Sequence, residues 1–102
     1  MIDAPMIDNL TCITGRIVSR APHPTLPDFD VVQLYLKKAE PVEGRADLLT
    51  VYTNQEIRVV VRRTLLGEVP IGTELRCRAK RIPEGAMCES HPESGNFSVN
   101  PF

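Results

Sequence analysis

The sequence predicts a small all-β domain of five or six strands with at most one short helical turn. Three observations support this prediction. Apolar and polar residues alternate in several short segments, which is the period of a strand with one buried face. Residues that favour turns, such as proline and glycine, interrupt the chain roughly every 8 to 12 residues. No segment of ten or more residues has the 3.6-residue period of an amphipathic helix.

The length of 102 residues suits one domain with a modest core. We expect residues 1–9 to be a loosely ordered leader and residues 10–102 to form a single β-barrel domain. The chain has no apolar run of about 18 residues, so we expect no transmembrane helix and no membrane partner. Its first residues include Asp3 and Asp8 and lack the basic segment of a secretory signal, which favours a cytoplasmic location.

The first half of the chain contains three predicted strands. Leu10–Arg20 is rich in β-branched residues, and Gly15 in its middle indicates a bend or bulge. Three of the nine prolines lie in Ala21–Asp30, which predicts a long loop. Asp30–Ala39 alternates cleanly, and its inward residues are Val32, Leu34 and Leu36. Asp47–Thr53 is the next predicted strand, and its inward residues are Leu49 and Val51.

The second half begins with a strand over Glu56–Arg63, whose inward residues are Ile57, Val59 and Val61. Thr64–Val69 is long enough for one helical turn, with Thr64 as its N-cap. Thr73–Ile82 alternates again, and its inward residues are Leu75, Cys77 and Ala79. A turn at Pro83-Glu84-Gly85 leads to short strands at residues 86–89 and 96–99.

This order of elements resembles the OB-fold, a five-stranded Greek-key barrel. The resemblance covers about residues 10–99 and rests on element order, because the fold has no diagnostic sequence motif. It implies a small five- or six-stranded Greek-key barrel in which Thr64–Val69 takes the place of the family's helix. Glu56–Arg63 is then an extra strand or the second arm of a long third strand. A β-sandwich or another six-stranded barrel is the alternative.

Charge is distributed unevenly along the chain. Glu56–Ile82 has seven basic and three acidic residues, a net charge of +4, whereas the remainder of the chain carries −5. The alternation predicts an outward basic face, to which neighbouring strands add aromatic residues: Arg58, Arg62, Arg76, Arg78, Lys80, Tyr35, Lys37 and Tyr52. Cations for phosphates and rings for base stacking are what single-strand binding requires. The resemblance to OB-folds also implies an oligonucleotide or sugar ligand on such a face.

Two other interpretations of the basic face stay open. It can be a solvated face, in which Glu56 and Glu74 pair with the cations, and the aromatic content of 5% without tryptophan favours this view. Alternatively, the protein is an interaction or oligomerisation module that uses exposed apolar residues such as Leu48 and Val60. The expected partner is therefore single-stranded DNA or RNA, and the alternative is a protein partner or a second copy of the chain.

Nothing in the sequence indicates an enzyme. The three cysteines, Cys12, Cys77 and Cys88, form no close pair, so buried free thiols are expected rather than a disulfide. Cys88 and His91 have the spacing of one zinc-ligand pair, but a zinc site needs a second pair. We therefore predict no catalytic residues, no metal site and no cofactor.

Overall fold

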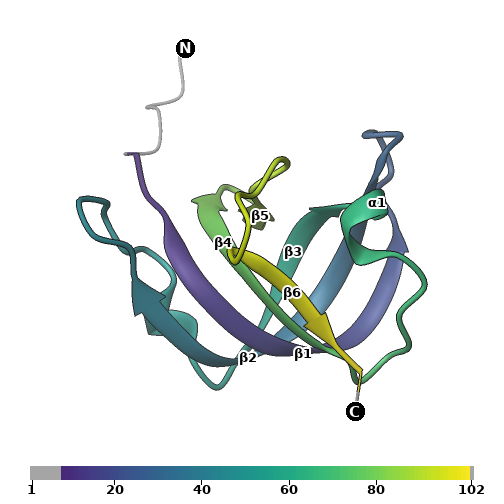
Figure 1. Cartoon of the computed structure of the whole chain (residues 1–102), viewed down its shortest axis with the longest axis horizontal. Coiled ribbons are helices and arrows are strands. Elements are labelled where there is room, and N and C mark those ends of the chain that lie inside the picture. The colour runs from purple at the N-terminus through teal and green to yellow at the C-terminus, as the bar shows by residue number, and fades with distance from the viewer. Residues whose placement is uncertain (1–7, 102) are drawn as a thin grey trace.

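The computed structural model describes residues 8–101, which form six strands and two short helical turns (Figure 1). The strands are β1 (Thr11–Pro22), β2 (Phe29–Pro41), β3 (Glu56–Arg62), β4 (Glu74–Ile82), β5 (Gly85–Cys88) and β6 (Phe97–Asn100). The helical turns are the 3-10 turn η1 (Thr50–Tyr52) and α1 (Arg63–Leu66). The predicted all-β class is thus confirmed. Within the described range, no helix is long and apolar enough to cross a membrane.

The strands close into a barrel. β1 pairs antiparallel with both β2 and β4, and β2 pairs antiparallel with β3. A parallel pairing of β3 with β5 and an antiparallel pairing of β5 with β4 complete the ring. β6 adds to the free edge of the first half of β4. This closed five-stranded barrel with one extra strand is compatible with an OB-like fold, and it excludes the β-sandwich alternative.

The core lies inside the barrel and is built by the predicted alternation. Val32, Leu34 and Leu36 of β2 are each 0% exposed, as are Leu75 and Ala79 of β4. The other strands and α1 complete one continuous cluster, which includes Ile13, Ile17, Leu49, Ile57, Val59, Val61, Leu66, Cys77, Ala86 and Cys88. Burial of each large aliphatic side chain contributes about 1.5–3 kcal/mol to folding, so this cluster stabilises the ring.

Two glycines allow the strands to approach closely. The register of β1 against β2 shifts between Thr14 and Gly15, which confirms the predicted bulge. A Cβ atom at Gly15 would collide with the carbonyl oxygen of Tyr35. Gly85 has a φ angle of +146°, and a Cβ atom there would collide with the carbonyl oxygen of Arg58. Gly85 therefore sets how closely β5 can lie against β3.

The prediction of a strand over Asp47–Thr53 is wrong. This segment contains the 3-10 turn η1, in which Leu49 is buried but Val51 is 75% exposed. The reason is local hydrogen bonding by the carboxylate of Asp47. It accepts bonds from the backbone N–H groups of Leu49 and Thr50, at 3.1 Å each, and from the Thr50 hydroxyl. Such bonds offer the backbone an alternative to a strand ladder.

The helical turn α1 begins one residue earlier than predicted. Thr64 lies inside it and is not its N-cap, because Arg62 occupies the cap position without a side-chain hydrogen bond to the turn. The Thr64 hydroxyl instead lies 3.2 Å from the Nε donor of Arg62. The predicted proline-rich loop is also shorter than expected, since β1 extends to Pro22 and β2 begins at Phe29.

Most of the predicted leader, residues 1–7, lies outside the described residues. Its last residue, Asn9, is 3% exposed and forms an isolated bridge with Ala46. The side-chain oxygen of Asn9 accepts a hydrogen bond of 2.6 Å from the backbone N–H of Arg81. Among the described residues, Asp8 and Asn9 thus both contact the rest of the domain, ahead of the predicted boundary at residue 10.

Candidate functional site

The outer wall of the barrel presents a cluster of cations around one exposed aromatic residue, Tyr35. Tyr35 points outward from β2 and is 37% exposed. In the β1–β2 register its partner is Arg16, which is also exposed. Residues opposite each other in an antiparallel pair lie on the same face, so Arg16 and Tyr35 are outward neighbours on the wall. We call Arg16, Tyr35, Lys37 and Arg58 the Tyr35 cluster.

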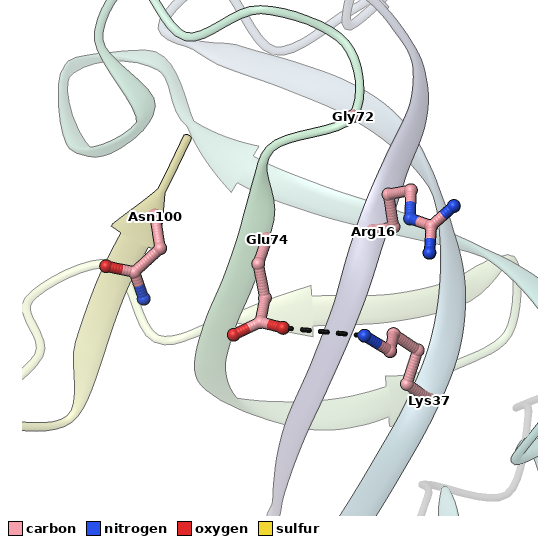
Figure 2. A pocket seen from close by; sticks show the side chains of 5 residues that line it. All are labelled: Arg16, Lys37, Gly72, Glu74 and Asn100. Atoms are coloured by element: carbon pink, nitrogen blue, oxygen red, sulfur yellow. Dashed lines mark ion pairs between the residues drawn. The ribbon is translucent and has the colours of Figure 1, made fainter. Parts of the chain in front are cut away.

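Lys37 is the next outward residue of β2, and its Nζ atom lies 3.7 Å from the carboxylate of Glu74. Figure 2 shows Glu74 reaching across β1 toward Lys37, with Arg16 on the same side as Lys37. These three residues, with Gly72 and Asn100, line an open pocket of about 460 Å³. Both side chains of the Lys37–Glu74 pair are more than 40% exposed, so water screens the pair and leaves Lys37 available for a ligand.

Arg58 adds a cation from β3 on the same wall. It is the register partner of Gln33, two residues along β2 from Tyr35. Its Nη1 atom is buried and has no hydrogen-bond partner among residues 8–101. Because an unpaired buried donor costs about 1–3 kcal/mol, an acceptor supplied by a ligand would lower the free energy of this group. Arg58 is therefore the side chain of the cluster with the clearest need for a partner.

Strand β5 divides the predicted basic face, because it lies between β3 and β4 in the sheet. Strand β5 separates β3 from the second half of β4, so Val60 of β3 aligns with Met87 and Met87 aligns with Lys80. Two strand spacings, about 10 Å, therefore separate the arginines of β3 from the cations of β4. The five predicted cations are in one sheet, but they form two groups.

Three arginines of this region contact the connection between β5 and β6. Arg62 Nη1 donates to the Ser90 carbonyl oxygen at 3.1 Å and lies 2.9 Å from Nε2 of His91. Arg76 Nη1 donates to the Gly95 carbonyl oxygen at 2.9 Å. Arg78 Nε lies 3.5 Å from a carboxylate oxygen of Glu89. Lys80, by contrast, is exposed and has no ion pair within the described part of the chain.

Tyr52 lines a second pocket, of about 280 Å³, together with Arg58 and Arg81. It lies in η1 at one end of the barrel, where its ring packs against the core and is 5.4 Å from the guanidinium carbon of Arg81. The prediction that Val60 is an exposed apolar residue is wrong. Val60 is 1% exposed and lies between its register partners Val31 and Met87. Leu48, the other residue expected there, is half-buried.

Sequence reasoning missed two features of the site. Arg16 carries no special pattern in the sequence, and only the strand register places it beside Tyr35. Asp30 is 4% exposed and pairs with Arg20 at 2.7 Å and with Arg63 at 2.9 Å. Burial alone would raise the pKa of Asp30, but the hydrogen bonds from the two arginines outweigh it and hold the pKa below its usual value. This cluster fixes the start of β2 against β1 and α1.

The thiols are not arranged as nucleophiles. A hydrogen bond with Cys88, together with burial, raises the pKa of Cys77 well above its usual value. Burial is the largest of the effects that raise the pKa of Cys12. Thiols with raised pKa values carry little thiolate at neutral pH, and the thiolate is the reactive form. Within residues 8–101, no three histidine, cysteine or acidic side chains are grouped as metal ligands.

No protein-family model matches this chain, no curated protein is similar to it, and no solved structure matches it. Its function has to be inferred from the geometry of the outer wall. That geometry combines an exposed aromatic ring, nearby cations and a buried Nη1 atom of Arg58 that has no acceptor among the described residues.

Proposed function

We propose that this protein is an OB-like, non-catalytic module that binds single-stranded nucleic acid across the outer wall of β1, β2 and β3. The observation that carries the proposal is the Tyr35 cluster. Tyr35 offers a ring for base stacking, and Arg16, Lys37 and Arg58 on β1, β2 and β3 are cations for phosphates, although the direct β3 partner of Tyr35 is Glu56. Stacking combined with backbone neutralisation gives binding with little sequence preference. The cytoplasmic location stays a prediction of the sequence.

The position of the cluster agrees with how OB-folds bind ligands. In that fold, oligonucleotides and oligosaccharides bind to the face formed by the second and third strands. Tyr35 and Lys37 lie on β2 and Arg58 lies on β3, so three members of the cluster occupy the corresponding strands. Gln33, the register partner of Arg58, adds an amide that can hydrogen-bond to base edges. Phe29, opposite Arg62 at the far end of the same two strands, supplies a second, half-buried ring.

Salt dependence of binding tests the proposal. A fluorescein-labelled oligo(dT) of about 12 nucleotides matches the site size of one OB-fold, and its anisotropy reports binding. If three or four phosphates are neutralised, the logarithm of the association constant should fall against log salt with a slope of about −2 to −3. Arg16→Gln should make this slope shallower by about 0.7, because one phosphate contact is lost. Tyr35→Ala should weaken binding by about 1–3 kcal/mol through lost stacking.

The matched control is Arg45→Gln. Arg45 is an exposed arginine in the turn after β2, paired with Asp8 at 2.6 Å, and its loss changes the net charge as much as Arg16→Gln does. It should leave the salt slope unchanged. The proposal is refuted if the oligonucleotide does not bind at low salt. It is also refuted if the two arginine variants weaken binding equally, since that result would reflect overall charge and not the Tyr35 cluster.

The alternative function is a protein-interaction or oligomerisation module, and one observation favours it. Ile71 and Val18 are 51% and 41% exposed, and they lie on adjacent segments because the backbone N–H of Gly72 donates to the Ile17 carbonyl oxygen at 2.8 Å. Light scattering across a range of protein concentrations tests this alternative. A dimer that is lost in Ile71→Ser would support it, and a monomer at all concentrations would count against self-association.

A further inference from the structure

The connection between β5 and β6, residues 89–96, is fastened to the barrel wall by three arginines. We call this segment the strap. Glu89 pairs with Arg78 at 3.5 Å at its beginning, and Arg76 donates to the Gly95 carbonyl oxygen at 2.9 Å near its end. Arg62 donates to the Ser90 carbonyl oxygen at 3.1 Å. Figure 1 shows the strap leaving the wall as a loop that rises from β5 and returns to β6.

The strap atoms that face the arginine side chains are all potential hydrogen-bond acceptors. They are two carbonyl oxygens, a carboxylate and the Nε2 atom of His91, which lies 2.9 Å from Arg62 Nη1. Since arginine only donates, Nε2 of His91 is the acceptor in this contact. Phosphate oxygens are acceptors as well, and as charged ones they form stronger bonds with guanidinium than carbonyl oxygens do. The strap therefore occupies donors that a phosphate backbone can take over.

Apart from these contacts, a backbone hydrogen bond from the Glu89 N–H to the Arg78 carbonyl oxygen, at 3.0 Å, holds the first residue of the strap. Its middle residues, 90–95, contribute nothing to the hydrophobic core, which includes Cys88 before the strap and against which Phe97 packs after it. Four of them are exposed, namely His91, Glu93, Ser94 and Gly95. One turn bond, from the Asn96 N–H to the Glu93 carbonyl oxygen, lies within it at 3.0 Å. Segments with few buried apolar contacts open at low free-energy cost.

The strap also lies where a bound strand would continue. The outward residues of β3 run from Glu56 through Arg58 to Arg62, so a strand that passes from Tyr35 over Arg58 next reaches Arg62. There it meets the acceptors of Ser90 and His91. Its phosphates and the strap would compete for the same guanidinium.

We propose that the strap is a displaceable competitor that shields Arg62, Arg76 and Arg78, and that single-stranded nucleic acid displaces it on binding. This inference rests on the proposed function and adds a form of regulation to it. Because three attachments must be exchanged, a ligand with several adjacent phosphates opens the strap more readily than isolated anions do. The strap thereby selects for polyanions over small ions.

Two isosteric variants within the strap test this competition. Glu89→Gln removes the carboxylate that faces Arg78, whereas Glu93→Gln removes an exposed carboxylate with no cation partner in the described residues. Both change the net charge and the charge of the strap by the same amount. Glu89→Gln should bind labelled oligo(dT) about threefold to tenfold tighter than Glu93→Gln does, because one attachment of the strap is lost. Equal affinities of the two variants would contradict the inference.

Amide hydrogen exchange of the unaltered protein gives a second readout that does not depend on any variant folding. When oligo(dT) binds, exchange should become faster in residues 89–96 and slower in β2 and β3. Slower exchange throughout the strap would show that it closes over the ligand, which overturns the inference but leaves the proposed function standing. If neither the wild type nor either variant binds oligo(dT) at low salt, both the proposed function and the strap inference fail.

Discussion

Asp30 is the charged side chain whose removal should affect stability most. Its carboxylate is 6% exposed and accepts hydrogen bonds from Nε of Arg20 at 2.7 Å and from Nε of Arg63 at 2.9 Å. These bonds tie β1, β2 and α1 together at one end of the barrel. Asp30→Asn keeps the size of the side chain but removes its charge and replaces one acceptor oxygen with a donor that faces an arginine.

The expected cost follows from the exposure of the three side chains. Breaking a buried ion pair by removing one partner costs about 3–5 kcal/mol. Arg20 is 20% exposed and Arg63 is 48% exposed, so water stabilises part of the charge that is left unpaired. We therefore expect Asp30→Asn to lower the free energy of unfolding by about 2–3 kcal/mol. For a domain of this size the melting temperature should fall by roughly 10–20 °C.

The pH dependence of this loss gives the prediction a second test. The pKa of Asp30 in the folded protein lies below its usual value, because hydrogen bonds from Arg20 and Arg63 outweigh the effect of burial. The unfolded chain therefore binds the proton more readily than the folded protein does. The stabilisation is fully present above the unfolded pKa of about 3.9, and it is lost as pH falls through the folded pKa. The stability gap between wild type and Asp30→Asn should thus be constant at neutral pH and narrow below about pH 4.

Urea denaturation between neutral and acidic pH measures this gap. The matched control is Asp28→Asn, two residues away, where the carboxylate is exposed and accepts no hydrogen bond within residues 8–101. It should change stability by less than about 0.5 kcal/mol. The reasoning is refuted if Asp30→Asn costs no more than this control at neutral pH, or if the gap stays constant down to about pH 3.

Two further predictions concern the β3–β5 contact and the thiols. Gly85→Ala should cost about 3 kcal/mol or more, because its Cβ would collide with the carbonyl oxygen of the neighbouring β3 residue at a φ angle of +146°. Gly44→Ala is its control, since Gly44 has a φ of +78° with nothing within 4 Å, and it should cost about 1–2 kcal/mol; equal losses in urea titrations would contradict the steric argument. In native protein, Ellman's reagent should leave Cys77 and Cys88 unmodified and react with Cys12 slowly, because the first two are buried and the pKa values of Cys12 and Cys77 are raised. All three should react in urea. Rapid reaction of two thiols before unfolding would show that Cys77 or Cys88 is accessible in the native barrel, which contradicts the prediction.

The parts of the fold that could be predicted from sequence are those decided by neighbouring residues. Alternation places Leu34 and Leu75 inside because successive side chains of a strand point to opposite faces. Gly15 could be recognised as a bulge because a glycine inside a strand pattern often marks a bulge or a bend. Asp47 misled the prediction because DLLTVYT has the composition of a strand, whereas its first side chain bonds to the backbone that follows.

The parts that could not be predicted depend on which strands become neighbours. Alternation correctly places Val60 on the outward side of β3, but its burial requires Met87 of β5 as a neighbour. The insertion of β5 between β3 and β4 also divides the basic residues into two groups. Similarly, Tyr35 could be predicted as outward, whereas Arg16 becomes its neighbour through the β1–β2 register, which a bulge has shifted. Register across a bulge is a property of the folded sheet, so no local pattern reveals it.

The parallel contact of β3 with β5 has a consequence for how the barrel forms and fluctuates. Its register comprises two pairs, Val59 with Ala86 and Val60 with Met87, whereas β1 and β2 pair along almost their whole lengths. The β1–β2 hairpin is local in sequence, but closure of the ring must join distant segments with few hydrogen bonds to offset the entropy lost. We therefore expect the β3–β5 pairing to form last during folding and to open first in the native state. Because Glu89 follows β5 directly, opening of the β3–β5 pairing would loosen the strap, while the curled sheet of β1, β2, β3 and β4 stays intact.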